Sequence, residues 1–278
     1  MAIYLKHSAN VKPWRWGGDT DIQYAVKENA GHIYGINPDN IVLAMPMWEN
    51  AGNRVINYAV MDAGLLSGVD WVGQGLDFNG YSSVDICSLP ALDKYKLVSP
   101  QGTIIFRAFS RALAIGTYPH LFSVRDATTQ ITLFSFNYDV TPHTYDLNFH
   151  CNGTSHYSSF NRVILNNWAT YAATWNGTNI NIYSLSSSGY YVDTFTTADI
   201  PLTSTIVPAI GNRQTGGRCL NGYVEHAVFT NSALSFDQII KFENRPWGLY
   251  EPVSRPTYFF LAATPAGGNQ NLMMMGVG

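Results

Sequence analysis

Alternation of apolar and polar residues in the middle of the chain constrains the fold more than any other feature. The pattern is clear in Gln130–Tyr138, Tyr145–Cys151 and Asn179–Leu185. Successive side chains of a β-strand point to opposite faces, so a period of two is typical of strands with one face in the core and one in solvent. The sequence therefore predicts a mostly β protein over residues 103–229.

Asn-Gly pairs divide the chain at four places and are typical of tight turns. The pair at Asn176 lies between two strand-like segments, Trp168–Trp175 and Asn179–Leu185. Asn-Gly tolerates the positive φ angles of primed turns, so we expect a hairpin with a primed turn here. Many short strands at this spacing predict an antiparallel β-sandwich or jelly roll. The expected strands are 41–48, 76–78, 83–87, 103–110, 120–124, 130–138, 145–151, 160–164, 168–175, 179–185, 190–195, 206–210 and 222–229.

One segment near the C-terminus has the pattern of a helix. Ser235 to Gln238 resembles a capping box, and Phe236, Ile239, Ile240 and Phe242 fall on one helical face. Pro246 ends the segment. A helix this short is not stable alone, so we expect its apolar face to lie on the sandwich.

The two ends of the chain lack sustained periodicity. We expect an extended N-terminal arm over 1–40, a main domain over 41–248 and an extended C-terminal tail over 249–278. Aromatic residues anchor interfaces, so those in or beside the arms are predicted to dock on partner proteins. The alternative is that the arms fold back on their own sandwich. The predicted docking residues are Trp14, Trp16, Trp247, Tyr258, Phe259 and Phe260.

Composition excludes several classes of protein. Of 278 residues, 46% are hydrophobic and only 13% are charged, which argues against a disordered chain. With 16 basic and 19 acidic residues the net charge is −3, and no basic stripe suits a phosphate backbone. No segment approaches the roughly 20 apolar residues of a membrane span. We therefore expect a soluble protein, made in a cytoplasm, that binds neither nucleic acid nor membrane.

The cysteines and histidines do not predict a metal site. Cys87, Cys151 and Cys219 are odd in number and far apart, so we expect free, mostly buried thiols. His150 and Cys151 are neighbours on a predicted strand, so their side chains point to opposite faces and do not converge with His156.

The search for catalytic patterns is also negative. A glycosidase on a related jelly roll needs two carboxylates that share one strand face, and none of the five glutamates has such a neighbour. A nucleophile elbow and a dinucleotide-binding loop are also missing from the sequence. We therefore expect that the protein is not an enzyme. Trp168, Trp175 and Phe149, on strands, are expected to fill the core.

Four groups of motifs follow one another from residue 41 onward: IVLAMPMWENAGN at 41–53, GLDFNGYSSVDI at 75–86, the hairpin over 168–183, and three pieces within 210–239. Their order resembles the laminin G-like, concanavalin A-like jelly roll common in bacteriophage and bacterial proteins. NRPWGLYEP at 244–252 is similar to an ending seen after this domain in many phage and prophage proteins.

This resemblance implies an antiparallel jelly-roll β-sandwich with one short C-terminal helix and extended terminal arms. It also implies a bacteriophage virion structural protein: a capsid decoration protein, head fibre or accessory tail component. Such a protein is made in the host cytoplasm, is located in the virion, forms homo-oligomers and docks on the major capsid or tail proteins. Laminin G-like domains often hold calcium at the rim; Asp62, Asp77 and Asp126 are candidates, but no spacing selects among them and no cofactor is placed.

A carbohydrate-binding module that recognises host-surface glycans is the alternative function. Its binding residues are predicted to be aromatic side chains in exposed loops. The candidates are Tyr81, Tyr118, Tyr157 and Tyr190.

Overall fold

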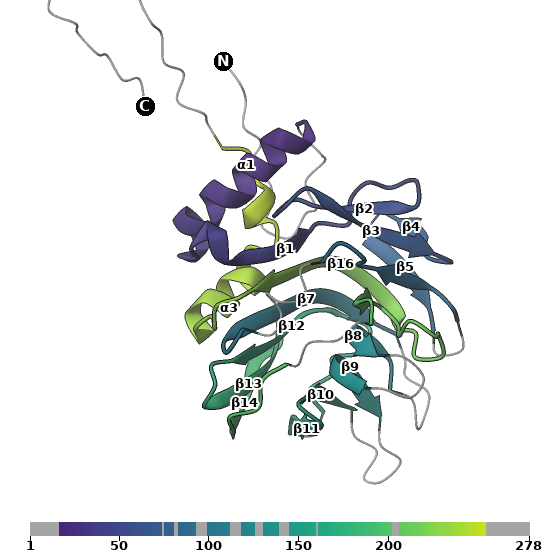
Figure 1. Ribbon diagram of the computed structural model, residues 1–278, viewed down its shortest axis with the longest axis vertical. Helices are drawn as coiled ribbons and strands as arrows, with labels where there is room; N and C mark the ends of the chain where they lie inside the picture. The colour runs from purple at the N-terminus through teal and green to yellow at the C-terminus, as the bar shows by residue number, and fades with distance from the viewer. Residues whose placement is uncertain are drawn as a thin grey trace, which may run out of the picture.

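Two antiparallel sheets pack face to face to form a β-sandwich, and helices cover part of one outer face (Figure 1). The computed structural model describes residues 17–73, 75–80, 83–92, 99–111, 118–125, 130–138, 145–159, 161–201 and 206–253. The expectation of an antiparallel β-sandwich is therefore confirmed.

The first sheet, sheet A, carries the helices on its outer face. Its strand order is β14-β13-β12-β7-β16-β5-β4, and β1 pairs with β16 beside β5. All of its strand pairs are antiparallel. The strands are β1 (Ile41–Met45), β4 (Asp70–Val72), β5 (Gly75–Asn79), β7 (Gly102–Ser110), β12 (Trp168–Trp175), β13 (Asn179–Ser186), β14 (Gly189–Thr196) and β16 (Asn221–Thr230).

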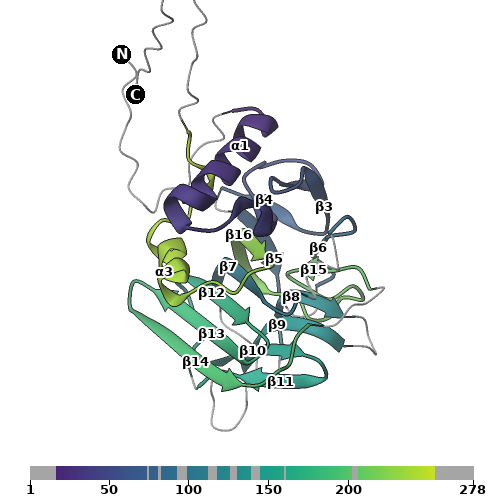
Figure 2. The same ribbon diagram turned by 60° about the vertical axis from the view of Figure 1, so that its left-hand side comes forward.

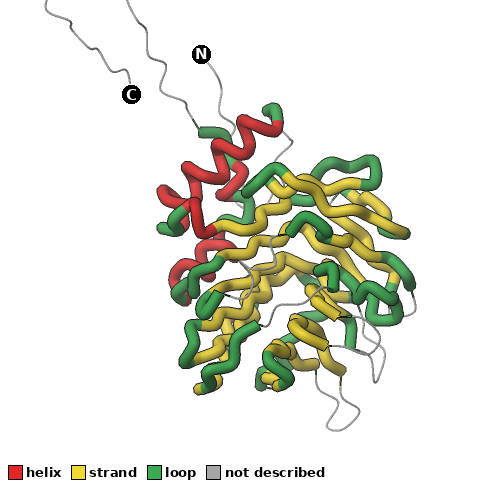
Figure 3. The backbone as a smooth tube through the Cα atoms, in the orientation of Figure 1, coloured by secondary structure: helices red, strands yellow, loops and turns green. Residues whose placement is uncertain are grey.

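The second sheet, sheet B, has the order β11-β10-β9-β8-β15-β6-β3-β2 and is also antiparallel. Figure 3 shows the strands of both sheets together with the loops that join them. The strands are β2 (Arg54–Asn57), β3 (Asp62–Ser67), β6 (Ile86–Ser88), β8 (His120–Arg125), β9 (Gln130–Tyr138), β10 (Tyr145–Cys151), β11 (Thr154–Tyr157) and β15 (Ala209–Ile210).

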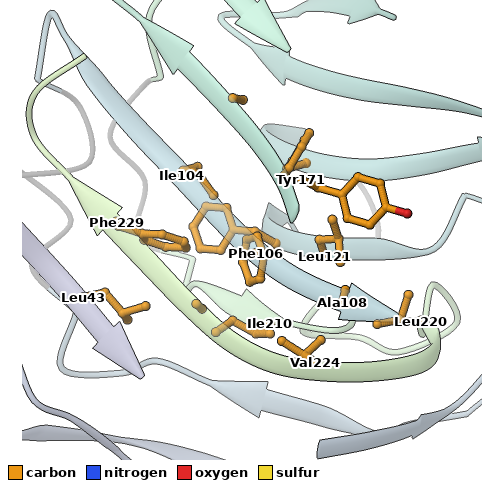
Figure 4. Packing of buried hydrophobic residues seen from close by; sticks show 14 of the residues in the cluster. Leu43, Ile104, Phe106, Ala108, Leu121, Tyr171, Ile210, Leu220, Val224 and Phe229 are labelled. Atoms are coloured by element: carbon orange, nitrogen blue, oxygen red, sulfur yellow. The ribbon is translucent and has the colours of Figure 1, made fainter. Parts of the chain in front are cut away.

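The inward-facing residues of both sheets form the main core. Phe106 of β7 and Phe229 of β16 meet edge to face, and Phe122 of β8 packs on Phe229 from sheet B. Trp175 and Phe149 stack with ring centroids 5.6 Å apart, so the prediction that both lie in the core is confirmed. Figure 4 shows part of this cluster, with Leu43, Ile104, Leu121 and Ile210 around Phe106 and Phe229.

Two Asn-Gly turns differ in a way that loop length explains. The predicted hairpin between β12 and β13 exists, but its loop has three residues and only Gly177 has positive φ. The primed turn expected at Asn176 is therefore wrong, because an Asn-Gly turn of type I′ needs positive φ at both residues and Asn176 does not have it. Asn152 (φ 50°) and Gly153 (φ 79°) instead form a two-residue turn between β10 and β11 with both angles positive.

Helix α3 (Phe236–Asn244) confirms the expected C-terminal helix. The Ser235 hydroxyl accepts a hydrogen bond from the Gln238 backbone N–H, and the Gln238 side chain accepts one from the Ser235 N–H. Ile239 and Phe242 are fully buried against the outer face of sheet A. Phe236 is more exposed than expected but still stacks on Tyr183 of β13.

Part of the predicted N-terminal arm is helical and packs on its own domain. Residues Asp19–Asn29 form α1, which continues as the π-helical turn η1 (Ala30–Tyr34), and a short 3₁₀ turn η2 (Pro38–Asn40) leads into β1. The apolar side chains of α1 recur at helical spacing and are buried at Ile22, Ala25 and Val26. The expectation of an extended arm is therefore wrong for residues 17–40.

The start of the predicted C-terminal tail packs against the same helix. Residues Gly248–Tyr250 form a 3₁₀ turn, η3, beside α1 (Figure 2). The Asn29 side-chain amide donates to the carbonyl oxygens of Leu249 (3.3 Å) and Glu251 (2.9 Å). Residues 17–40 and 247–251 therefore pack on their own sandwich and contact each other there.

Candidate functional site

A row of aromatic side chains crosses the outer face of sheet A. Trp168 of β12 pairs with Phe109 of β7, Phe109 pairs with Tyr223 of β16, and Tyr223 pairs with Asp77 of β5. Side chains directly opposite on neighbouring strands share a face and contact each other. We call Phe109, Trp168 and Tyr223 the aromatic patch.

The three rings of the aromatic patch contact one another and remain partly exposed. The rings form a compact triangle, in which the Phe109 centroid is 5.7 Å from that of Trp168 and 5.6 Å from that of Tyr223. The centroids of Trp168 and Tyr223 are 6.3 Å apart. All three side chains have intermediate exposure, unlike the rings of the core. The patch is therefore a surface feature built on three adjacent strands.

The bulge in β16 brings Tyr223 to this face. The pairing of β16 with β7 shifts register between Val224 and His226, so Glu225 is an extra residue. An extra residue reverses the inward and outward alternation on one side of it. Tyr223 therefore shares the outer face with Val228, which packs under the helices, although the two positions differ by an odd number.

Charged side chains border the aromatic patch. The Arg111 guanidinium lies 4.3 Å above the Tyr223 ring and donates to Asp77 at 2.7 Å. Both side chains are partly exposed. A cation over a tyrosine face is favourable, and the ion pair fixes where the guanidinium lies. The patch thus presents apolar rings beside a positioned donor and a carboxylate.

A buried ion cluster lies next to the aromatic patch on the same face. Arg107 of β7 contacts Glu225 through Nε and Glu243 through Nη1, each at 2.8 Å. The Thr170 hydroxyl donates to Glu243 at 2.7 Å. Burial raises the pKa of Glu243, and the neighbouring Arg107 opposes this shift. The Arg107 guanidinium is also 6.0 Å from the Trp168 ring, so the cluster supports one side of the patch.

The prediction that Trp168 lies in the core is wrong. Trp168 and Trp175 are seven positions apart on β12, and an odd separation places side chains on opposite faces. Trp175 points inward to Phe149, so Trp168 points outward to the patch. The alternation that predicted strand β12 therefore also indicated, from the odd separation of the two tryptophans, that Trp168 points outward.

The structure does not bring the tyrosines predicted to bind glycans together. Tyr118, Tyr157 and Tyr190 are exposed as expected, at 38%, 47% and 44%. Tyr118 precedes β8 and packs on Arg218, Tyr157 lies on β11, and Tyr190 on β14 donates to Asn244. They occupy three separate places, and Tyr81 lies outside the described residues.

Of the predicted docking residues, only Trp247 falls in the described part of the chain. Trp247 is 3% exposed and stacks on Trp48 at 6.4 Å, within the cluster that joins α1 to sheet A. It therefore anchors the segment after α3 to its own domain instead of offering a surface to a partner. Trp14, Trp16, Tyr258, Phe259 and Phe260 lie outside the described residues.

In the described part of the chain, the cysteines are buried and the candidate metal ligands lie apart from one another. The three cysteines are free and buried, as predicted. His150 and Cys151 point to opposite faces of β10, with His150 contacting Ser155 while Cys151 lies in the core. In the residues that the structure describes, no group of three His, Cys, Asp or Glu side chains converges. Asp62 and Asp77 lie in different sheets, and Asp126 is outside the described residues.

None of the helices in the described part of the chain has the length and hydropathy needed to cross a bilayer. A scan against models of protein families finds no match, and a search of curated proteins also finds none. What relates this chain to known proteins is its three-dimensional fold.

Solved structures with this fold include proteins that contain bound sugars. Trypanosoma rangeli sialidase in complex with sialic acid matches with a TM-score of 0.56 and 14% identity, over 82% of this chain. This chain spans 38% of that sialidase chain. Domain 4 of a GH43 extracellular arabinanase from Geobacillus stearothermophilus, in complex with arabinotriose, matches with a TM-score of 0.50 and 11% identity. That match covers 73% of this chain and 98% of the arabinanase domain. At these identities the likeness defines the fold alone.

The prediction that the protein is not an enzyme is corrected. Solved sialidase chains contain this fold, so the fold gives no ground for excluding an enzyme. The sequence argument also considered only carboxylates on a single strand. The structure brings Glu225 of β16 and Glu243 of α3 to the same guanidinium, a pairing that spacing along one strand does not reveal.

Proposed function

We propose that this protein is a carbohydrate-binding β-sandwich and that the aromatic patch is its glycan-binding surface. The observation that carries the proposal is the row of Trp168, Phe109 and Tyr223, which is partly exposed and ends at the Arg111–Asp77 ion pair. This arrangement is built on three neighbouring strands and holds its rings in contact before any ligand arrives.

The chemistry of the patch suits a sugar. Sugar rings have apolar C–H faces and polar hydroxyl edges, so sites for them combine aromatic rings with a few positioned hydrogen-bonding groups. Here the rings of the patch offer the apolar surface. Arg111 offers donors and Asp77 offers an acceptor at one end of the row. A sugar lying over the three rings contacts both kinds of group.

The buried ion cluster supplies rigidity to this surface. Arg107 is held by two carboxylates and in turn lies beside the Trp168 ring. A preorganised aromatic side chain loses less conformational entropy when a ligand binds. We therefore assign Arg107 a positioning role for the patch, with Glu225 and Glu243 holding it in place.

The proposal also includes the type of β-sandwich and the particle on which the protein is located. We infer that the sandwich is the laminin G-like jelly roll that its motifs resemble, carried on a bacteriophage virion. In that setting the aromatic patch contacts host-surface glycans. Homo-oligomers or neighbouring virion proteins present several copies, and several weak sites acting together bind tightly.

Titration calorimetry with a panel of oligosaccharides tests the proposed function, with arabinotriose and sialic acid included in the panel. We expect the full-length protein to bind at least one member of the panel. Trp168→Ala should weaken that binding about 30-fold or more, because removing an aromatic anchor costs about 2 kcal/mol or more.

Tyr118→Ala is the matched control, because Tyr118 is an exposed aromatic residue outside the patch. The control should bind as the wild type does. Loss of binding in Tyr118→Ala with full binding in Trp168→Ala contradicts the assignment of the site. Failure of every sugar in the panel to bind the wild type contradicts the proposed function itself.

A further inference from the structure

Strand β14 lies at the edge of sheet A, beyond β13 (Figure 2). Within the described residues it pairs with β13 alone, over all eight of its positions and without a bulge. The strands at the other ends of the two sheets, β4, β11 and β2, have only three, four and four residues. Short edge strands limit pairing with other chains, so β14 is the end strand best suited to such pairing.

The backbone hydrogen-bonding groups of β14 alternate between its two sides. One position beyond the strand, the Thr197 N–H donates to the Thr178 carbonyl oxygen at 2.9 Å, in the same register as β13 and β14. Hydrogen-bonded and non-hydrogen-bonded pairs alternate in an antiparallel ladder, so the odd-numbered residues of β14 bond to β13. The N–H and C=O groups of Tyr190, Val192 and Thr194 therefore point toward the open edge. Such a row of donors and acceptors is a template for a further strand.

The side chains at this edge are apolar and exposed. Tyr190, Tyr191 and Val192 are 44%, 39% and 46% exposed, and Phe236, which stacks on Tyr183 of β13, is 38% exposed. These are four of the ten large hydrophobic residues that are exposed in the described part of the chain. Edge strands are commonly protected by lysine, proline or a bulge, and β14 has none of these. The edge therefore has the character of an interface.

We propose that β14 is a dimer interface, which pairs antiparallel with β14 of a second copy across a two-fold axis at Val192. In this register Val192 faces Val192 of the second copy, and Tyr190 of each copy faces Thr194 of the other. These are the positions whose N–H and C=O groups point outward, so each pair exchanges two backbone hydrogen bonds. The two copies of sheet A then form one continuous sheet.

Charge complementarity supports a second copy as the occupant. Tyr191 and Asp193 share the face of β14 whose Phe195 packs on the main core. The Arg162 guanidinium lies 4.3 Å from the centre of the Tyr191 ring, and its Nε is 3.4 Å from Asp193. In the register centred on Val192, Asp193 of each copy faces Tyr191 of the other and thus lies beside a second Arg162. A register centred on Asp193 sets two carboxylates opposite each other, which is destabilising.

The dimer places both aromatic patches on one side of the joined sheet. A two-fold axis perpendicular to the sheet keeps the outer faces of both copies on the same side. Seven strand spacings separate β7 of one copy from β7 of the other, which is about 34 Å along the sheet. A surface that carries many glycans can then engage both patches, and avidity strengthens its binding. This consequence rests on the proposed function, whereas the interface itself does not.

Val192→Lys tests the interface, because two copies then place like charges opposite each other at the axis. The strand should tolerate the change, since Val192 is exposed and lysine is common on edge strands. Val192→Glu should act in the same way. Val60→Lys is the matched control, because Val60 is 48% exposed and lies between β2 and β3 of sheet B. Thermal unfolding checks that all three variants are folded.

Sedimentation velocity over a range of protein concentrations measures the dimer. A contact built on one strand is small, so we expect the wild type and Val60→Lys to dimerise at high concentration and to dissociate on dilution. Each Val192 variant should stay monomeric where the wild type is dimeric. An equal mixture of Val192→Lys and Val192→Glu should restore a dimer, because opposite charges then meet at the axis.

Three results overturn the interface. They are a wild type that is monomeric at every concentration, a dimer that both Val192 variants leave unchanged, and a dimer that Val60→Lys also abolishes. If a monomeric wild type protects the Val192 amide from hydrogen exchange, another segment of this chain covers the edge and the dimer is likewise rejected. If both Val192 variants are monomeric and their mixture is too, the pairing of Val192 with itself is wrong. None of these results bears on sugar binding by the aromatic patch, so the proposed function is tested separately.

Discussion

Trp168 and Phe109 face each other across β12 and β7 with ring centroids 5.7 Å apart and ring planes at 63°. This edge-to-face geometry is favourable for aromatic pairs and fixes both rings relative to the sheet. Arg107, two positions along β7 from Phe109, lies beside the same indole. The stability of the ion cluster and the geometry of the aromatic patch are therefore linked.

We predict that Arg107→Met lowers the free energy of unfolding by about 3–5 kcal/mol. The substitution leaves Glu225 and Glu243 buried without their cation, and breaking a buried ion pair on one side is strongly destabilising. Urea denaturation measures the change. Adding Glu225→Gln and Glu243→Leu should recover most of the loss, since no unpaired charge then remains. A loss of less than 1 kcal/mol in Arg107→Met contradicts the described ion cluster.

We predict that Asn29→Ala lowers the free energy of unfolding by about 1–3 kcal/mol. The substitution leaves the carbonyl oxygens of Leu249 and Glu251 without the amide that now donates to them. Limited proteolysis should also cut the chain near these residues faster than in the wild type. Lys27→Ala, at an exposed position of the same helix, is the control. Equal cleavage of all three proteins contradicts the packing of η3 against α1.

Acid should destabilise the protein through buried neutral histidines. Burial and the nearby Arg107 lower the pKa of His226 to about 3. Because the unfolded chain has the ordinary pKa of about 6.5, it takes up a proton that the folded protein does not. This contribution is complete above pH 6.5 and is lost as the pH falls toward 3, by about 1.4 kcal/mol per unit.

Comparison with His226→Leu isolates this effect, because other groups titrate in both proteins. His120 acts in the same direction, and Glu243, whose pKa is raised by burial, acts in the opposite direction. Urea denaturation at pH 7, 6, 5 and 4 should show the wild type losing stability faster than the variant. Parallel curves for the two proteins contradict a neutral buried His226.

The three thiols should be inert in the folded protein. Burial raises the pKa of Cys87, Cys151 and Cys219 to about 12, so almost no thiolate is present at pH 8. A thiol reagent such as Ellman's should label none of them in the native state and all three in urea. Rapid labelling of the native protein disagrees with their burial.

The β-sandwich and the capping box of helix α3 were predictable because both depend on local sequence patterns. Alternation predicted most strands of sheets A and B, and Ser235 with Gln238 predicted the start of α3. The short strands β2, β3, β4 and β11 were missed, and residues 161–164, expected to lie in a strand, do not form one. Helix α1 was missed although Ile22, Ala25 and Val26 recur at helical spacing, because the Trp-rich and Gly-Gly segment before it suggested an arm.

The candidate site was less predictable because it depends on pairing between strands. No local pattern shows that Trp168, Phe109 and Tyr223 form one row, since the register of β12, β7 and β16 is set by tertiary structure. The bulge at Glu225 further hides the direction of Tyr223. The opposite directions of Trp168 and Trp175 could have been read from their odd separation.

The resonance of the Trp168 indole N–H in a proton–nitrogen NMR spectrum tests the central claim most directly. The resonance is assigned as the one that is missing from the spectrum of Trp168→Phe. The titrant is the oligosaccharide that the protein binds. We predict that the Trp168 resonance shifts in proportion to saturation while that of Trp175, buried against Phe149, does not. Saturation of the protein with an unchanged Trp168 resonance contradicts the assignment of the aromatic patch as a glycan-binding surface.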